Sequence, residues 1–181
     1  MKIITSLFLI FIPVCLWGQA VTEKNQSVSI EMLGIEYSNE LPLSDKHTVR
    51  LHGGLVGGYL FYEINIGDWY NNNGVLYSLN GKFGADFRYY YNLSKREMKG
   101  KSTFRNTGNF WAADVSYYTP SIMSSKHTAT SHIVALSPYW GIRRVYKSNL
   151  FFELNLGITI LTHEGMFGGT PLTGLKFGYV F

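Results

Sequence analysis

The chain has 181 residues, enough for one domain, and 15% of them are charged, against about 25% in an average soluble protein. Aromatic residues make up 16% of the chain, and its formal net charge is +4 at pH 7. This charge is too small to predict a nucleic acid partner, and the fine mixture of polar and apolar residues suits strands that alternate between two environments.

The first 20 residues have the form of a secretory signal peptide. Lys2 supplies the positive n-region, residues 3–17 form an apolar stretch, and residues 18–20 have the small-x-small form of a cleavage site. The apolar stretch is shorter than the about 20 residues that a membrane-spanning helix needs. We therefore expect a signal peptide over 1–20 and one domain over 21–181. Since the only cysteine, Cys15, lies in the signal, we expect no disulfide in the mature domain.

Period-2 alternation recurs along the rest of the chain and predicts strands. After position 20 no stretch of about 20 apolar residues occurs, which excludes a helical membrane protein. Most of the predicted strands reach the about nine to eleven residues that a tilted strand needs to cross a bilayer. The seven segments span residues 28–41, 47–63, 75–92, 108–119, 131–146, 150–162 and 172–181.

Short and long connections join these segments. Residues 42–46 and 147–149 read as short turns. In the second turn, pairing of Tyr146 with Leu150 makes Asn149 available for a left-handed position and sets Arg143 opposite Glu153. Three connections are longer and polar, and we expect open loops there: residues 64–74, 120–130 and 163–171.

The polar face of the strands carries formal charges in mid-strand. Soluble half-buried sheets also alternate, so the position of the charges matters more than the alternation itself. If this face points into a narrow barrel, the charges must pair with one another. We therefore expect an ion-pair network in the lumen, formed by Lys82, Asp86, Arg88, Asp114, Arg143 and Glu153.

The apolar face carries rings near the strand ends. Two aromatic girdles that flank an apolar band are typical of transmembrane barrels, which must close because hydrocarbon cannot satisfy a free sheet edge. The sequence thus predicts an all-β fold, a closed up-and-down antiparallel transmembrane barrel. One expected girdle holds Tyr59, Phe61, Tyr77 and Tyr117, and the other holds Tyr37, Tyr89, Tyr91, Trp111, Tyr179 and Phe181.

The sequence resembles the small outer-membrane β-barrel proteins of Gram-negative bacteria. The resemblance rests on the signal peptide and on the last strand, in which Leu175, Phe177, Tyr179 and Phe181 alternate with other residues. It implies a location in the outer membrane, contact with its lipid, and recognition of the C-terminal strand by the barrel-assembly machinery. Residues 88–95 and 141–144 look like patches shared by uncharacterised barrels of this kind.

Barrels of this group have an even number of strands, so we expect eight rather than seven. The alternation slips between Met32 and Leu33, which places a bulge or a second short strand within residues 22–41. The first and second long loops are the other places where a strand is expected.

The sequence favours a structural or surface-interaction protein, a plugged membrane anchor that presents three outer loops. Two other classes stay open, a narrow porin-like channel for small solutes and an envelope enzyme that acts on lipid or lipopolysaccharide. A soluble lipocalin-like barrel is the competing fold, since the same alternation permits an apolar lumen and a charged exterior.

Three further features carry weaker hypotheses. Residues 93–105 contain five basic residues and one acidic residue, which predicts a solvated periplasmic turn or contact with anionic lipid head groups or the cell wall. His163 and Glu164 adjoin, but two ligands do not make a metal site, and we expect no cofactor. No catalytic residue is assigned, although two histidines lie near serines of an outer loop: His127, His132, Ser124, Ser125 and Ser131.

Overall fold

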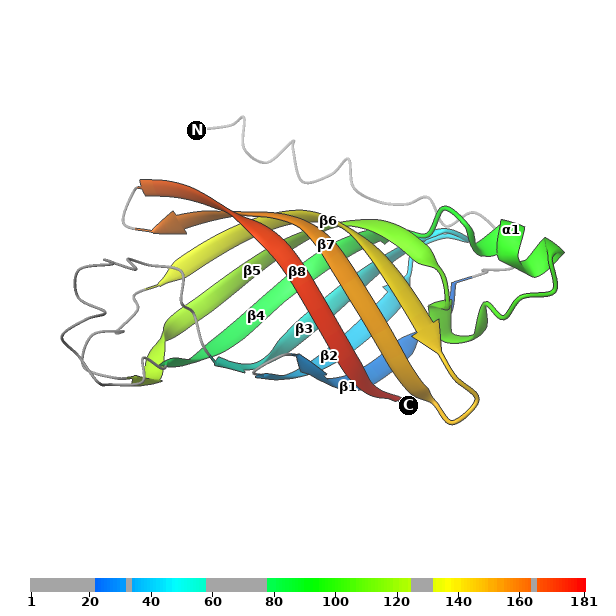
Figure 1. Ribbon diagram of the computed structural model, residues 1–181, viewed down its shortest axis with the longest axis horizontal. Coiled ribbons are helices and arrows are strands. Elements are labelled where there is room, and N and C mark those ends of the chain that lie inside the picture. The colour runs from blue at the N-terminus through cyan, green and yellow to red at the C-terminus, as the bar shows by residue number, and fades with distance from the viewer. Residues whose placement is uncertain (1–21, 32–33, 58–77, 125–131, 164–165) are drawn as a thin grey trace, which may run out of the picture.

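In the computed structural model of the protein, residues 22–31, 34–57, 78–124, 132–163 and 166–181 are described. They form eight antiparallel strands in a closed barrel, in which each strand pairs with the next and the last returns to the first (Figure 1). This confirms the predicted all-β, up-and-down barrel. The strands are β1 (Asn25–Glu31), β2 (Gly34–Pro42), β3 (His47–Gly57), β4 (Ser78–Tyr89), β5 (Asn109–Ser124), β6 (Ile133–Val145), β7 (Leu150–His163) and β8 (Met166–Val180).

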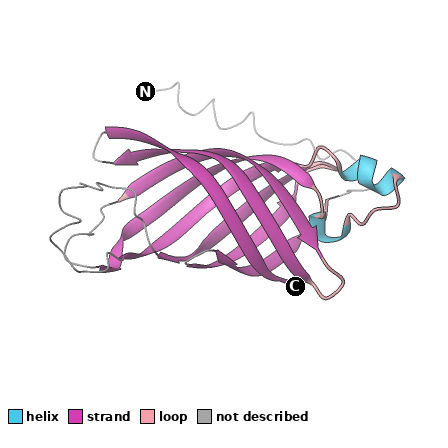
Figure 2. Ribbon diagram, in the orientation of Figure 1, coloured by secondary structure: helices cyan, strands magenta, loops and turns pink. Residues whose placement is uncertain are grey.

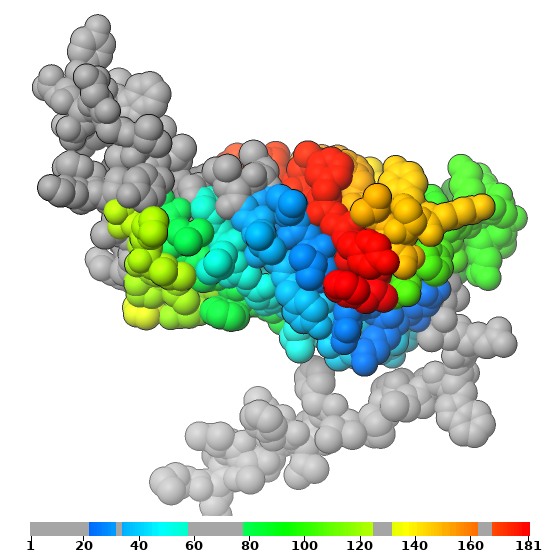
Figure 3. All heavy atoms as spheres, turned by 90° about the horizontal axis from the view of Figure 1, so that it is seen from below, coloured from blue at the N-terminus to red at the C-terminus, as the bar shows by residue number. Residues whose placement is uncertain are grey.

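The eighth strand lies where the alternation slips. The predicted segment 28–41 is two strands, because β1 and β2 form a hairpin that pairs as far as Glu31 and Gly34. Ile30 and Ile35 lie opposite each other and both point outward, so the hairpin shifts the outward set from even to odd positions. With an even number of strands, β8 closes on β1 in the antiparallel sense. Figure 3 shows β8 in red beside β1 in blue, as one continuous wall.

Two predicted loops are partly strand. β5 continues to Ser124, and β8 begins at Met166, so the loop expected over 163–171 was wrong. Pro171 reads as a loop residue in the sequence, yet it pairs with Ile158 of β7. β1 pairs with β8 only from Lys176 onward. The other edge of β8 at Pro171 therefore has no partner on β1, and an edge position tolerates a residue without an N–H group.

Both predicted short turns are confirmed. β2 ends at Pro42 and β3 begins at His47. Asn149 has a φ of 60°, and the Tyr146 N–H donates to the Leu150 carbonyl over 2.8 Å. The register that follows sets Arg143 opposite Glu153, as the sequence predicts.

The two ends of the barrel differ. Helix α1 (Leu93–Met98) and the 3-10 helix η2 (Phe104–Asn106) lie between β4 and β5, at the same end as the C-terminus (Figures 1 and 2). We call this the α1 end, and the end where β3 finishes and β4 begins the far end. Among the described residues no helix is long and apolar enough to cross a membrane.

The strands turn their polar face inward and their apolar face outward. The charged residues in the middle of β3, β4 and β7 are buried in the lumen, whereas large apolar residues of the same strands are exposed outside. The lipocalin-like arrangement, with the charges outside, was therefore wrong. Several expectations lie outside the described residues: the signal peptide over 1–20, the loop over 64–74, Tyr59, Phe61, Tyr77, Ser125, His127, Ser131 and Glu164.

Candidate functional site

Aromatic and aliphatic side chains fill the lumen at the α1 end. Tyr90, Leu93 and Phe110 are completely buried. The Phe110 ring lies 5.1 Å from the Tyr90 ring and 6.0 Å from the Tyr139 ring, measured between centroids. Together with Ala112 these groups form a packed layer at this end of the lumen, and Arg88 lies 4.4 Å from the centre of the Phe110 ring.

Glu153 is the acceptor for the first group of charges. Arg88 binds its carboxylate with two parallel contacts of 3.0 Å, and Arg143 Nη1 adds a third at 3.0 Å. Asn155 Nδ2 donates a fourth hydrogen bond over 3.1 Å. Glu153 and Arg88 are both fully buried. Parallel contacts of this kind are the strong form of an arginine–carboxylate pair and fix both side chains in orientation.

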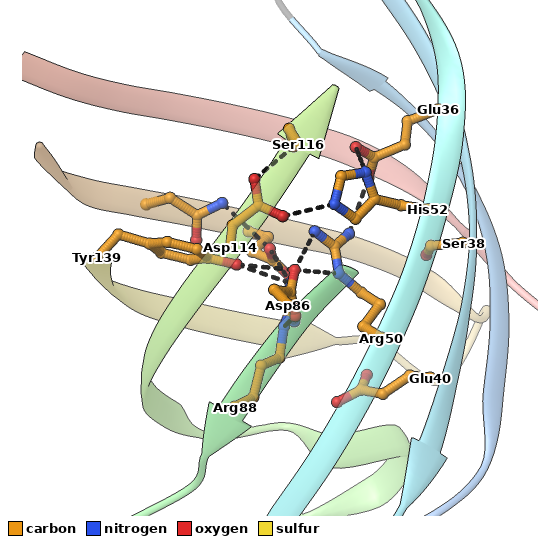
Figure 4. A network of polar contacts seen from close by, with 12 residues as sticks. Glu36, Ser38, Glu40, Arg50, His52, Asp86, Arg88, Asp114, Ser116 and Tyr139 are labelled. Carbon is orange, nitrogen blue, oxygen red and sulfur yellow. Dashed lines mark hydrogen bonds and ion pairs between the residues drawn. The ribbon is translucent and has the colours of Figure 1, made fainter. Parts of the chain in front are cut away.

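Asp86 joins this group to the next one along the lumen (Figure 4). One carboxylate oxygen accepts from Arg88 Nε over 2.8 Å. The other accepts from Arg50 Nε over 2.8 Å and from the Tyr139 hydroxyl over 3.1 Å. Asp86 thus lies between two guanidinium groups, which is the pairing that a buried carboxylate requires.

Glu36 is the centre of the second group. Its carboxylate lies 2.7 Å from Arg50 Nη1, 2.7 Å from Lys176 Nζ and 3.3 Å from Lys82 Nζ. Glu31 contacts the same two lysine ammonium groups. Since Lys176 is on β8 and Glu36 on β2, these pairs bridge the two strands that flank β1 on either side.

His52 reaches Asp114 across a glycine. His52 is on β3 and Asp114 on β5, yet His52 Nε2 lies 2.7 Å from Asp114 Oδ1 (Figure 4). Between them on β4, Gly84 pairs with His52 on one side and Ser116 on the other. A Cβ atom at Gly84 would lie 2.6 Å from His52 Cε1 and 2.7 Å from Ser116 Oγ, so the contact requires glycine here.

The arrangement of His52, Asp114 and Ser116 differs from that of a serine nucleophile with a histidine as its general base. Ser116 Oγ donates to Asp114 Oδ2 over 2.5 Å, whereas an activated serine would donate to the histidine. His52, Asp86 and Asp114 also offer three potential metal ligands within 4.8 Å of one another. Because both oxygens of Asp86 already accept from guanidinium groups, ion pairs account for this cluster without a cation.

The charges of the network nearly balance. Six carboxylates face five permanent cations, with His52 between Glu36 and Asp114 as the remaining group. The carboxylates are Glu31, Glu36, Glu40, Asp86, Asp114 and Glu153, and the cations are Arg50, Lys82, Arg88, Arg143 and Lys176. Glu40 lies nearest the α1 end, where it accepts from Tyr90 and Thr48.

The structure places the six lumen charges expected from the sequence inside the barrel and brings all six into this network. Six groups that complete it were not among those six, namely Glu31, Glu36, Glu40, Arg50, His52 and Lys176. The same alternation puts each of them on the inward face, so the signal was present in the sequence. What period 2 does not supply is the partner of each charge.

A cavity of about 370 Å³ remains between this network and the far end. Arg50, Lys82 and Tyr139 lie at its inner side, and Val56 and Leu161 are among its walls. The lumen is therefore filled at the α1 end and hollow toward the far end.

The rings expected in the girdles and lying in the described residues are all on the outside of the barrel. Some also have polar partners, since Tyr91 accepts from Trp140 Nε1 over 3.0 Å and the Tyr117 hydroxyl lies 2.5 Å from His132 Nδ1. Tyr89, Tyr91 and Trp111 flank the strand ends at the α1 end. The exposed set is Tyr37, Tyr89, Tyr91, Trp111, Tyr117, Tyr179 and Phe181.

Comparison of the chain with known protein families, with curated proteins and with solved structures finds no match.

Proposed function

We propose that the chain is an outer-membrane β-barrel protein of the structural or surface-interaction class. One observation carries the proposal, a row of outward apolar residues that crosses five neighbouring strands. Each residue of the row pairs directly with the next, and the four large ones are at least 39% exposed. The row is Leu51, Ala85, Val115, Leu136 and Ile160. Water-soluble proteins rarely expose so continuous an apolar surface, whereas a lipid-facing barrel requires it.

The strand lengths support the same proposal. β3 to β8 have 11 to 16 residues each. A strand tilted by about 40° covers roughly 2.5 Å of membrane normal per residue, so about ten residues cover the roughly 25 Å apolar band of such barrels. Over the paired length the barrel is closed, so its strands present no free edge of N–H and C=O groups to the hydrocarbon of a membrane.

The packed layer at the α1 end favours the role of an anchor rather than that of a channel. Tyr90, Phe110 and Arg88 are completely buried there, so these side chains occupy the lumen on the α1 side of the network. An anchor of this kind would act through what it presents at its ends. Under the proposal, β8 also presents its outward rings to the barrel-assembly machinery during insertion.

The segment 93–105 is a candidate contact for anionic lipid head groups. α1 lies beyond the end of the barrel (Figure 1), and Met98 on it is 81% exposed beside the basic side chains. Each basic residue near an anionic surface contributes about 1 kcal/mol of attraction. The cell wall, the other partner expected from the sequence, would be reached from the same end of the barrel.

A charge on the outward face tests the location directly. At the bilayer midplane, Val115→Arg should lower the free energy of unfolding by about 2–4 kcal/mol. At a water-exposed site the same change costs within about 0.5 kcal/mol. Met98→Arg, on the exposed surface of α1, is the matched control, and in vesicles of neutral lipid, which leave out the head-group contact proposed above, it should be neutral in either case.

The assay is folding into phospholipid vesicles, followed by denaturant titration and by electrophoresis with and without boiling. A heat-dependent band shift, together with fractionation of the protein with outer membranes, is the expected result. A protein found soluble in the periplasm, for which Val115→Arg is as neutral as Met98→Arg, would overturn the proposal. Mass spectrometry of lipid A with and without the gene would detect a lipid-modifying activity, which the proposal does not include.

A further inference from the structure

The cavity at the far end has the size and the lining of a small-molecule site. Its volume of about 370 Å³ lies within the range of roughly 300–1,000 Å³ that ligand pockets occupy. Val56, Tyr118, Leu161 and Leu172 give it an apolar wall, and charged side chains of the network form its floor. An apolar wall with a few convergent polar groups is the usual composition of a binding pocket.

The floor of the cavity favours an anion. Among the described residues that line it are three permanent cations, Arg50, Lys82 and Lys176, and two carboxylates, Glu31 and Asp114. Arg50 is held by Glu36 and Asp86, which lie behind the floor. The two lysine ammonium groups also contact Glu36, but each of them has a second carboxylate partner, Glu31, that itself lines the cavity.

Glu31 is the partner that a ligand would replace. It is the last residue of β1, and its side chain is 19% exposed, against 3% for Glu36. Its carboxylate lies 3.6 Å from Lys82 Nζ, which Glu36 approaches to 3.3 Å, and it also contacts Lys176 Nζ closely. Glu31 thus occupies the position of an anion at the cavity floor, and it is the more exposed of the two carboxylates that serve both lysines.

We propose that the cavity binds a small amphipathic carboxylate. The carboxylate replaces that of Glu31 at Lys82 and Lys176, and the apolar body lies against Leu161 and Leu172. The ligand forms charge-assisted hydrogen bonds to two ammonium groups that are mostly shielded from water, where such bonds are strongest. This inference goes beyond the structural role proposed above and depends only on the interior of the barrel, whatever surrounds it.

Methyl NMR of the full-length mature protein tests the proposal with hexanoate as the probe. Leucine and valine methyl groups are labelled in the detergent-solubilised barrel. Those of Val56, Leu161 and Leu172 report on the cavity, while those of the outward Leu51 and Leu136 report on partition of the probe into detergent. We expect saturable shifts of the cavity methyl signals alone, and binding of hexanol, which has the same body without the charge, at least about tenfold weaker.

Two variants at the floor predict opposite changes. Lys82→Met should weaken hexanoate binding about tenfold, since one charge-assisted hydrogen bond is lost. Glu31→Gln should tighten it, since the competing carboxylate is removed. A merely destabilised barrel would weaken binding in both variants.

Filling the cavity gives an independent check. Leu161→Trp should abolish the shifts at Val56, whereas Ile160→Trp, its outward neighbour on β7, should leave them intact. The proposal is overturned if the cavity signals do not respond to hexanoate, if hexanol binds as tightly, or if Glu31→Gln weakens binding as Lys82→Met does.

Discussion

Removal of the Glu153 charge is the sharpest test of the lumen network. Glu153 accepts four hydrogen bonds, three of them from guanidinium groups. In Glu153→Gln the remaining oxygen can keep the bonds from Arg88 Nη2 and Asn155. The new amide group then faces Arg88 Nη1 and Arg143 Nη1, where donor meets donor. All of these side chains are buried, so water cannot replace the lost acceptor.

The expected cost follows from those contacts. Two charge-assisted hydrogen bonds are lost, each worth about 1.5–3 kcal/mol. Breaking one partner of a buried ion pair costs about 3–5 kcal/mol in total. Glu153→Gln should therefore lower the free energy of unfolding by about 3–5 kcal/mol.

The assay is denaturant unfolding in lipid vesicles, followed by tryptophan fluorescence, since Trp111 lies on the outer surface. Glu97→Gln, which removes an exposed carboxylate from α1, is the control and should change stability by less than about 0.5 kcal/mol. In the double variant with Arg143→Met, the total loss in the free energy of unfolding should be smaller than the sum of the two single losses, because the residues are in contact. A Glu153→Gln protein within about 1 kcal/mol of the parent would show that this carboxylate is not desolvated as argued.

Three other predictions concern the glycine, the closed end and the basic segment. Gly84→Ala should cost about 1–3 kcal/mol of stability, because the added Cβ overlaps His52 and Ser116, whereas Gly169→Ala, which meets nothing within 4 Å, should be nearly neutral in the same unfolding assay. Single-channel recording of the reconstituted barrel should detect no stable conductance, and steady ion-selective openings would restore the channel hypothesis. Replacing the basic side chains of the α1 segment with glutamine should reduce the preference of the protein for vesicles with anionic over neutral lipid, while equal binding before and after would exclude a lipid-head-group role for Lys95, Arg96, Lys99 and Lys101.

The sequence is informative about faces because the pleat fixes the alternation. In β4 the three charged residues expected inside the barrel lie inside, namely Lys82, Asp86 and Arg88. A strand cannot turn one of these side chains outward without turning its neighbours inward. The same rule indicated an irregularity before β2, because the parity of the outward residues changes only at a bulge or at a chain reversal, and the structure shows the reversal.

The sequence is less informative about partners and about strand ends. The contact between His52 and Asp114 skips a strand and depends on Gly84, whose role is visible only once the register of three strands is known. A register shift between Leu79 and Lys82 moves the pairing of β4 with β5, and no residue pattern announces it. The polar connection over 163–171 was expected to be an open loop, but its residues from Met166 onward extend β8, and among the described residues Pro171 pairs on one edge only, which is compatible with a strand.

The closure of the barrel has a kinetic consequence. The ion pair between Glu36 and Lys176 joins residues 140 positions apart in the chain. Contacts between residues so far apart in the chain form only after the intervening strands are in place, because the chain must first lose the conformational entropy of closing the long loop between them. We therefore expect Lys176→Met to raise the rate of unfolding and to leave the rate of folding nearly unchanged. On this basis the ion pair sets the lifetime of the closed barrel rather than the speed of its formation.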